Sequence, residues 1–214
     1  MTTKKTFQNL SPSKQDRITL AAIEEFSEKG YAGASINALV DHLGIAKGSI
    51  FQYFGDKKGL FYFIFDTCTE MVKARLRIIR DQTRDDQLFS RLEKSLTAGV
   101  AFLSEHPRIY KLYLQVLFGS KIPFRDEILL SLRKYSHEYL HSLLESARDK
   151  GELRENLDMD KACFVIDAIM DRFLQAHMIR HLDAGVGLHQ ADDPLIQVWI
   201  AELMEIIRHG IGRS

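Results

Sequence analysis

The stretch SINALVDHLGIAKGSIFQYF, from Ser35 to Phe54, decides how the rest of this 214-residue chain is organised. Ser35 is suited to begin a helix, because its hydroxyl can accept a hydrogen bond from an unpaired N–H group of the first turn. An apolar stripe then predicts a short helix with one buried side, made by Leu39, Val40 and Leu43. Gly44 predicts the end of this helix, since a left-handed residue costs least as glycine.

A second short helix follows at once, beginning near Ala46. Ile50 and Phe54 give it an apolar stripe of its own. Two short helices joined by a glycine-containing turn of about three to four residues are typical of a helix-turn-helix.

The second helix has polar chemistry that a purely structural helix does not need. Lys47 can pair with a phosphate or a guanine edge. Gly48 lets the backbone approach a surface, although glycine costs roughly 1 kcal/mol relative to alanine inside a helix. Ser49, Gln52 and Tyr53 have hydrogen-bonding tips suited to phosphates and base edges. An ordinary helical hairpin with a solvated polar face is the alternative interpretation of such a motif.

The surroundings of this motif resemble one protein family. Through RITLAAIEEFSEKGYAGASINALVDHLGIAKGSIFQYFGDKKGLF the chain is similar, without a gap, to the tetracycline-repressor (TetR) family of transcriptional regulators. The resemblance rests on Ala21, Ala22, Phe26, Gly30, Tyr31, Ser35, Gly44, Ile45, Lys47, Gly48, Ser49, Ile50, Tyr53, Phe54, Lys57 and Leu60. The chain departs from the family pattern at Leu43, Ala46 and Phe51, where alanine, a serine or threonine cap, and tyrosine are usual.

The resemblance implies a DNA-binding protein that works as a homodimer on a double-stranded operator. The residues that it places at the major groove are Lys47, Gly48, Ser49 and Gln52. Those that it places at phosphates are Ser35, Tyr53 and Lys57. Two copies would present their recognition helices to successive major grooves, about 34–36 Å apart, on a near-palindromic site.

The resemblance also implies a mostly apolar cavity for a small-molecule effector in the C-terminal helical bundle. The candidate lining residues are Phe61, Phe65, Phe102, Tyr113 and Phe173. A homodimer interface is implied through about 160–182 and 193–209. The candidate interface residues are Ile169, Phe173, Ile196, Trp199, Ile200 and Leu203.

Helical periodicity along the whole chain predicts an all-α protein with about nine helices. A three-helix DNA-binding domain is expected over residues 1–55, with 1–10 as a disordered arm. A larger helical domain for ligand binding and dimerisation is expected over 56–214. The last two helices are expected to be capped by Asp158 or Asp160, and by Asp192 or Asp193.

Charge and composition set limits on the class of protein. The chain has 29 basic and 29 acidic residues, which argues against a protein that coats nucleic acid without specificity. Cys68 and Cys163 show no paired spacing, which favours a reducing compartment. No apolar run approaches the roughly 18–20 residues that a membrane span needs. We therefore expect a cytoplasmic protein that is not bound to a membrane.

Other constellations are weaker. His177 and His181 have the i, i+4 spacing of two metal ligands, with His189 and Asp183 nearby, but His177 continues an apolar stripe and no acidic ligand completes the helix face. Asp167 and Asp171 have the same spacing, and a solvated helix face explains them better than acid–base chemistry. With no nucleophile, phosphate-loop or dinucleotide motif, we expect no catalytic residue, cofactor or metal.

The sequence thus predicts a ligand-responsive transcriptional regulator, with repression as the expected mode and a small, apolar effector that releases it from the operator. The alternative is a helical interaction protein, or an architectural DNA-binding protein, without effector control.

Overall fold

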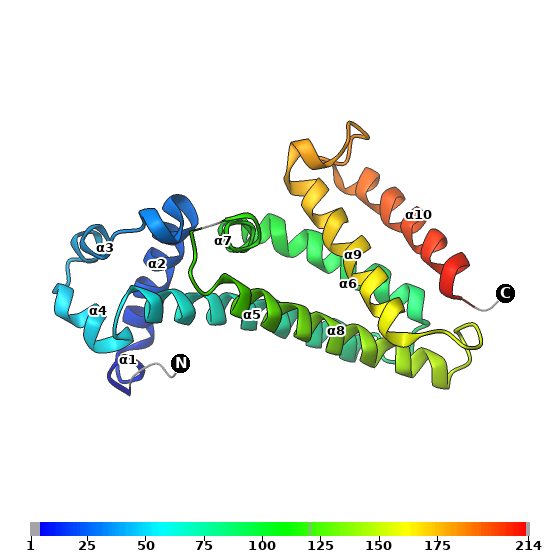
Figure 1. Ribbon diagram of the computed structural model, residues 1–214, viewed down its shortest axis with the longest axis horizontal. Coiled ribbons are helices and arrows are strands. Elements are labelled where there is room, and N and C mark those ends of the chain that lie inside the picture. The colour runs from blue at the N-terminus through cyan, green and yellow to red at the C-terminus, as the bar shows by residue number, and fades with distance from the viewer. Residues whose placement is uncertain (1–4, 120, 213–214) are drawn as a thin grey trace. The chain divides into compact units, whose positions relative to one another are not determined.

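The computed structural model describes residues 5–119 and 121–212. In these residues the chain forms ten α-helices and one short 3-10 helix, which confirms the predicted all-α class (Figure 1). Two compact units are present. Unit 1 comprises the described residues up to Ala74 together with Leu103–Leu129, and unit 2 comprises Arg75–Phe102 together with the described residues from Leu130 onward.

Unit 1 contains the three helices of the predicted DNA-binding domain. α2 (Pro12–Gly33) begins at Pro12, whose fixed φ and missing N–H suit a first helical turn. Its regular geometry is interrupted at Gly30, where φ is 67° and ψ is 171°. α3 (Ile36–Leu43) packs against α2 and against α4 (Lys47–Phe54). Their shared core contains Ile18, Ala22, Phe26, Leu39, Leu43 and Ile50.

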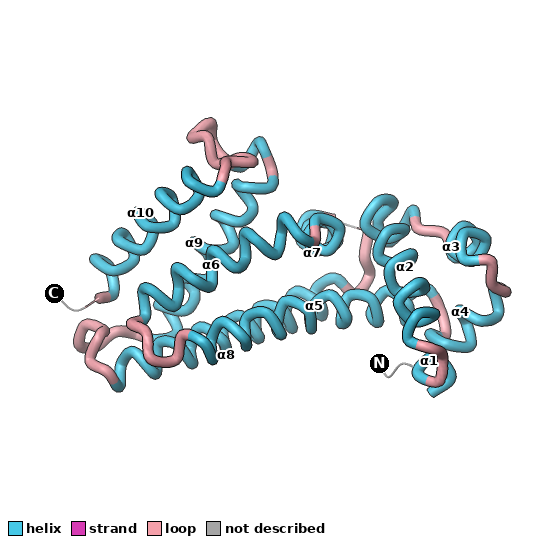
Figure 2. The backbone as a smooth tube through the Cα atoms, turned by 180° about the vertical axis from the view of Figure 1, so that it is seen from behind, coloured by secondary structure: helices cyan, strands magenta, loops and turns pink. Residues whose placement is uncertain are grey.

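A short additional helix, α1 (Lys5–Gln8), contacts α4 (Figure 2). The Phe7 side chain is only 3% exposed. Its ring centroid lies 4.9 Å from that of Phe54 and 5.0 Å from that of Phe63. The expected disordered arm over 1–10 is therefore wrong for residues 5–10, because an aromatic cluster holds them. Residues 1–4, with Lys4, lie outside the described residues.

Two further helices contribute to unit 1. α5 (Lys57–Gln82) follows α4 directly, and the Asp56 carboxylate accepts the Gly59 N–H at 2.7 Å, which caps its first turn. A Cβ atom at Gly59 would overlap with the carbonyl oxygen of Phe54, so the last residue of α4 lies directly against α5. α7 (Pro107–Phe118) packs along α2.

Unit 2 is a helical bundle with one apolar core. Its main helices are α6 (Leu88–Glu105), α8 (Arg125–Asp149), α9 (Met159–Met178) and α10 (Asp193–Ile211), with the 3-10 helix η1 (Arg180–Leu182) after α9. α9 and α10 lie side by side in both views (Figures 1 and 2). The core includes Leu92, Leu96, Leu140, Leu143, Leu144, Ile166, Ile196 and Ile200.

The alternatives for the two helix caps are resolved in favour of the earlier residue of each pair. The Asp158 side chain accepts the Lys161 N–H, and the Asp192 side chain accepts the Leu195 N–H, both at 3.1 Å. Among the described helices, none combines the length and the apolarity that crossing a membrane requires.

Candidate nucleic-acid interface

The first helix of the motif is fixed at both ends as the sequence predicted. The Ser35 hydroxyl accepts the Ala38 N–H at 3.3 Å, and Gly44 ends α3 in the left-handed region at φ 65° and ψ 35°. The Ser35 N–H donates to the Glu25 carboxylate of α2 at 2.7 Å. This bond holds the start of α3 against α2. Ser35 and Gly44 therefore set the length of α3, and Glu25 sets its position on α2.

α4 turns the predicted base-reading residues away from the core. Ile50 is fully buried beneath the helix, while Lys47, Gly48 and Gln52 are exposed and Ser49 is half-buried. A Cβ atom at Gly48 would meet nothing within 4 Å, so the helix backbone is open to a close approach at this point. The side of α4 that faces solvent therefore combines a cation, an amide and an uncovered backbone.

Phe51 belongs to this surface, although the sequence marks it only as a position where the family usually has tyrosine. Its side chain is 39% exposed, and the Lys47 ammonium lies 5.9 Å from the centre of its ring. Phenylalanine is one of the side chains that contact thymine methyl groups in the major groove. The sequence contains a signal for the exposure of Phe51. This residue directly follows Ile50, which is buried, and consecutive residues of a helix point to different sides.

Two of the predicted phosphate-binding residues also hold the domain together. Ser35 is half-buried as the cap of α3. The Lys57 ammonium donates to the Ala32 carbonyl at 3.3 Å and lies 5.1 Å from the centre of the Tyr31 ring. Burial lowers the pKa of Lys57, and the nearby charge of Glu25 opposes this shift. An ammonium has three N–H donors, so Lys57 can donate to a phosphate as well as to the Ala32 carbonyl. The phosphate contact itself stays a prediction.

The N-terminal helix α1 contacts Tyr53 and Gln52 at the C-terminal end of α4. The Tyr53 ring is half-buried, with its centroid 5.8 Å from that of Phe7 in an edge-to-face arrangement. The Thr6 hydroxyl donates to the Gln52 carbonyl at 3.4 Å. Lys5 is exposed in the same short helix. The sequence gives no reason to place α1 here, because a single phenylalanine in a polar stretch has no periodic pattern.

The predicted ligand-pocket residues are distributed over both units. Phe61 and Phe65 are buried in unit 1, with ring centroids 6.1 Å apart, and Tyr113 of the same unit is half-buried. Phe102 and Phe173 are buried in unit 2. Their role in binding a ligand stays a prediction.

The predicted dimer residues divide into two groups. Phe173, Ile196 and Ile200 are buried inside unit 2 by the same chain, so their side chains have almost no surface left for a second copy. Ile169, Trp199 and Leu203 are half-buried at the edge of that core. The large apolar side chains that these helices do expose are Phe164, Val165, Leu195, Val198 and Ile206.

The weaker constellations take structural roles. His177 is buried, and its Nδ1 lies 3.2 Å from the Leu188 carbonyl oxygen, whereas His181 is exposed. Asp167 and Asp171 both pair with Arg133 of α8, at 3.1 Å and 2.6 Å. In the part of the chain that the structure describes, no group of three potential ligands could hold a metal ion.

The capped turn, the exposed side of α4 and the separate helical unit define a helix-turn-helix DNA-binding protein. The chain belongs to the TetR family of transcriptional regulators. The family model for bacterial regulatory proteins of the tetR family matches residues 18–62, and the model for the tetracyclin repressor-like C-terminal domain matches residues 86–211. It is thus a transcription regulator and not an enzyme.

Individual relatives agree with this assignment. The probable acrEF/envCD operon repressor of Escherichia coli strain K12 is 23% identical over 201 residues, which cover 90% of this chain and 87% of that protein. A TetR family regulator from Chloroflexus aurantiacus has a similar crystal structure, with 28% identity, complete coverage of both chains and a TM-score of 0.72. FadR of Bacillus subtilis, crystallised with stearoyl-CoA, shares the fold at 19% identity, 90% and 96% coverage and a TM-score of 0.70.

Proposed function

We propose that this regulator is a repressor that binds a near-palindromic operator as a homodimer, and that a small molecule bound in its C-terminal helical region releases it. The observation that carries the proposal is the exposed side of α4, formed by Lys47, Gly48, Phe51 and Gln52 above the buried Ile50. Repression is supported by the name of the E. coli relative, an operon repressor.

Each of these side chains has a suitable partner in the major groove. Lys47 is matched to guanine or to a phosphate, Gln52 to the hydrogen-bonding edge of adenine, and Phe51 to a thymine methyl group. Ser35, Tyr53 and Lys57 would hold the flanking phosphates and fix the register of the helix. The proposed operator half-site therefore contains at least one thymine whose methyl group meets Phe51.

Dimerisation is supported by the outward sides of α9 and α10. Phe164 is 73% exposed there, Ile206 is 65% exposed and Val198 is 60% exposed. Covering such large apolar side chains with a second copy is favourable, at roughly 25 cal/mol for each Å² removed from water. A two-fold axis would bring the same helices of both copies together, and it would give the protein the symmetry of a palindromic site.

Effector control is supported by the course of α5. This single helix begins directly against the last residue of α4 and continues from unit 1 into unit 2. A ligand that binds better to the conformation unable to bind DNA would shift the population toward it. FadR of B. subtilis is a protein of this fold that has been crystallised with a ligand, stearoyl-CoA.

The test is a titration of the purified protein with labelled DNA from the region upstream of its own gene. Fluorescence anisotropy at about 50 mM and about 200 mM salt should show tight binding that weakens steeply, because phosphate contacts release counterions. A scrambled duplex of the same length should bind about 10³-fold more weakly. Equal binding to both duplexes would contradict a specific regulator and would favour an architectural role.

A further inference from the structure

An arginine of unit 2 is buried without a counter-charge among the residues that the structure describes. Arg91 of α6 is only 5% exposed, although arginine is almost never fully buried unless it is paired. Its Nε atom is buried and has no hydrogen-bond partner among the described residues. Leu88, Leu92 and Leu96 of the same helix belong to the apolar core of the unit. A mostly buried guanidinium that has no ion pair among the described residues is unfavourable.

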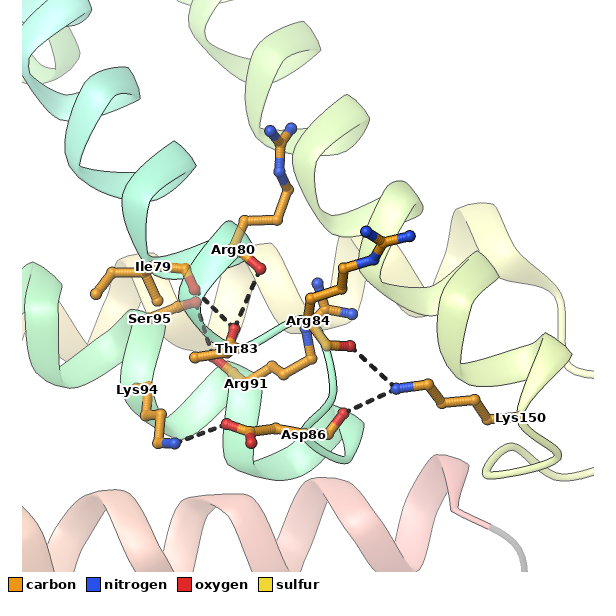
Figure 3. Close-up of polar contacts among 9 residues, drawn as sticks. All are labelled: Ile79, Arg80, Thr83, Arg84, Asp86, Arg91, Lys94, Ser95 and Lys150. Carbon is orange, nitrogen blue, oxygen red and sulfur yellow. Dashed lines mark hydrogen bonds and ion pairs between the residues drawn. The ribbon is translucent and has the colours of Figure 1, made fainter.

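Three acids around the start of α6 are bonded to other groups. The Asp86 carboxylate is turned to Lys94 at 2.6 Å (Figure 3). Glu152 accepts the Leu88 N–H at 2.6 Å, and Asp81 pairs with Arg80 at 2.9 Å. In the described part of the chain, these carboxylates are thus committed to a lysine, a helix N-terminus and another arginine.

The polar side chains next to Arg91 do not neutralise it either. The Ser95 hydroxyl donates to the Arg91 carbonyl at 2.8 Å, so the Tyr139 hydroxyl must donate in the 2.9 Å contact between Ser95 and Tyr139. Burial raises the pKa of Tyr139, although the hydrogen bond with Ser95 and the charge of Arg91 oppose this shift. The phenol therefore stays neutral at physiological pH, and it supplies no negative charge to Arg91.

We propose that Arg91 is the anion-binding residue of unit 2, and that it receives the carboxylate or phosphate group of a small molecule whose remainder is apolar. A guanidinium offers a planar fork of N–H donors that fits the two oxygens of either anion. The apolar core on the same helix favours a ligand with an apolar body. The inference rests on the proposed function only where this anion is taken as the effector, since binding itself is measured without DNA.

The first experiment measures binding of probe molecules to the full chain by calorimetry and by thermal unfolding. Octanoate and octyl phosphate represent the two anions, and octanol is their neutral counterpart. At least one anion should bind about tenfold more tightly than octanol and raise the melting temperature with concentration. If neither anion binds more tightly than octanol, the proposal is overturned. The stronger of the two anions identifies the headgroup.

Variants then assign the effect to Arg91. R91Q removes the charge and should weaken binding of the preferred anion by about tenfold, while binding of octanol stays unchanged. R84Q is the matched control, because Arg84 lies seven positions earlier in the chain and its side chain is exposed. Wild-type affinity in R91Q, or an equal loss of affinity in R84Q, would show that Arg91 does not bind the anion specifically.

A conservative variant covers the case in which R91Q does not fold. R91K keeps the positive charge but loses the planar fork, so it should bind the anion about fivefold more weakly while melting near the wild-type temperature. Unchanged affinity in R91K would contradict recognition by the guanidinium.

The DNA titration separates this inference from the proposed function. If octanoate or octyl phosphate binds through Arg91 and weakens operator binding, both proposals are supported. If the anion binds through Arg91 while operator binding is unaffected, the anion site stands and the proposal that this anion is the effector fails.

Discussion

At the scale of single residues, the prediction for Lys47 is the sharpest. Its ammonium is exposed on α4, so K47A should weaken operator binding by about tenfold and reduce the salt dependence by the equivalent of about one phosphate contact. K111A removes another exposed lysine, from α7 outside the proposed interface, and should bind normally. Anisotropy titrations at several salt concentrations measure both quantities. Wild-type affinity in K47A would show that Lys47 does not contact the operator.

Glu25 gives a prediction that depends on pH. Its carboxylate accepts the Ser35 N–H at 2.7 Å and pairs with Lys29 at 2.9 Å. Burial by itself would raise the pKa of Glu25, but Lys29 and the Ser35 N–H together lower it below its ordinary value. A lowered pKa in the folded state adds stability above the unfolded value of about 4.3, and this stability is lost as the pH falls through the folded pKa.

E25Q should therefore lower the free energy of unfolding by about 1 kcal/mol at neutral pH. The glutamine amide can still accept the hydrogen bond, but it lacks the charge that strengthens it. The difference from wild type should shrink between about pH 5 and about pH 3. Thermal unfolding followed by circular dichroism measures it. E28Q is the control, since Glu28 is exposed on the same helix. A difference that stays constant with pH would show that the charge of Glu25 is unimportant.

At the scale of elements, α1 depends on one side chain. The ring of Phe7 is 3% exposed in a cluster with Tyr53, Phe54 and Phe63. F7A should cost about 3 kcal/mol, as is usual for a buried phenylalanine. Because α1 should detach as well, deletion of residues 1–9 should cost no less than F7A. Chemical denaturation compares the two variants, and an F7A protein as stable as wild type would mean that the cluster does not hold α1.

The helices could be predicted where their ends carry a local signal. Ser35 and Gly44 each act within one turn of the chain, and α3 starts and ends where the sequence indicated. For α9 the local signal left Asp158 and Asp160 as alternative caps, and the structure selects Asp158. α1 could not be predicted in this way, because its order comes from Phe54 and Phe63, more than 40 positions away along the chain.

Which side of a helix faces a partner is also not a local property. The apolar residues of α10 cover more than one side, and periodicity alone did not show that Ile196 and Ile200 face the core while Val198 and Ile206 face solvent. The same limit applies to Arg91. A single arginine in a helix gives no signal until the structure shows that the neighbouring acids have other partners.

At the scale of the whole molecule, the prediction concerns the homodimer. V198E places a charge on the outward side of α10, where Val198 is 60% exposed, and it should convert the proposed dimer to a monomer because a buried unpaired charge is unfavourable. The control is V186E, in a loop where Val186 is 53% exposed. Size-exclusion chromatography with light scattering gives the mass of each variant. A dimeric V198E would place the interface elsewhere.

The contact at Gly59 has a consequence for mutational tolerance. The Phe54 carbonyl occupies the space that a Cβ atom at position 59 would need. The end of α4 and the start of α5 are therefore packed too closely for any side chain at this position. In a library that randomises each codon and selects for a folded protein, only glycine should survive at position 59. Position 48, where a Cβ atom meets open space, should accept alanine in the same selection. Gly59 and Gly48 would thus be retained for different reasons, the first by packing and the second by the DNA.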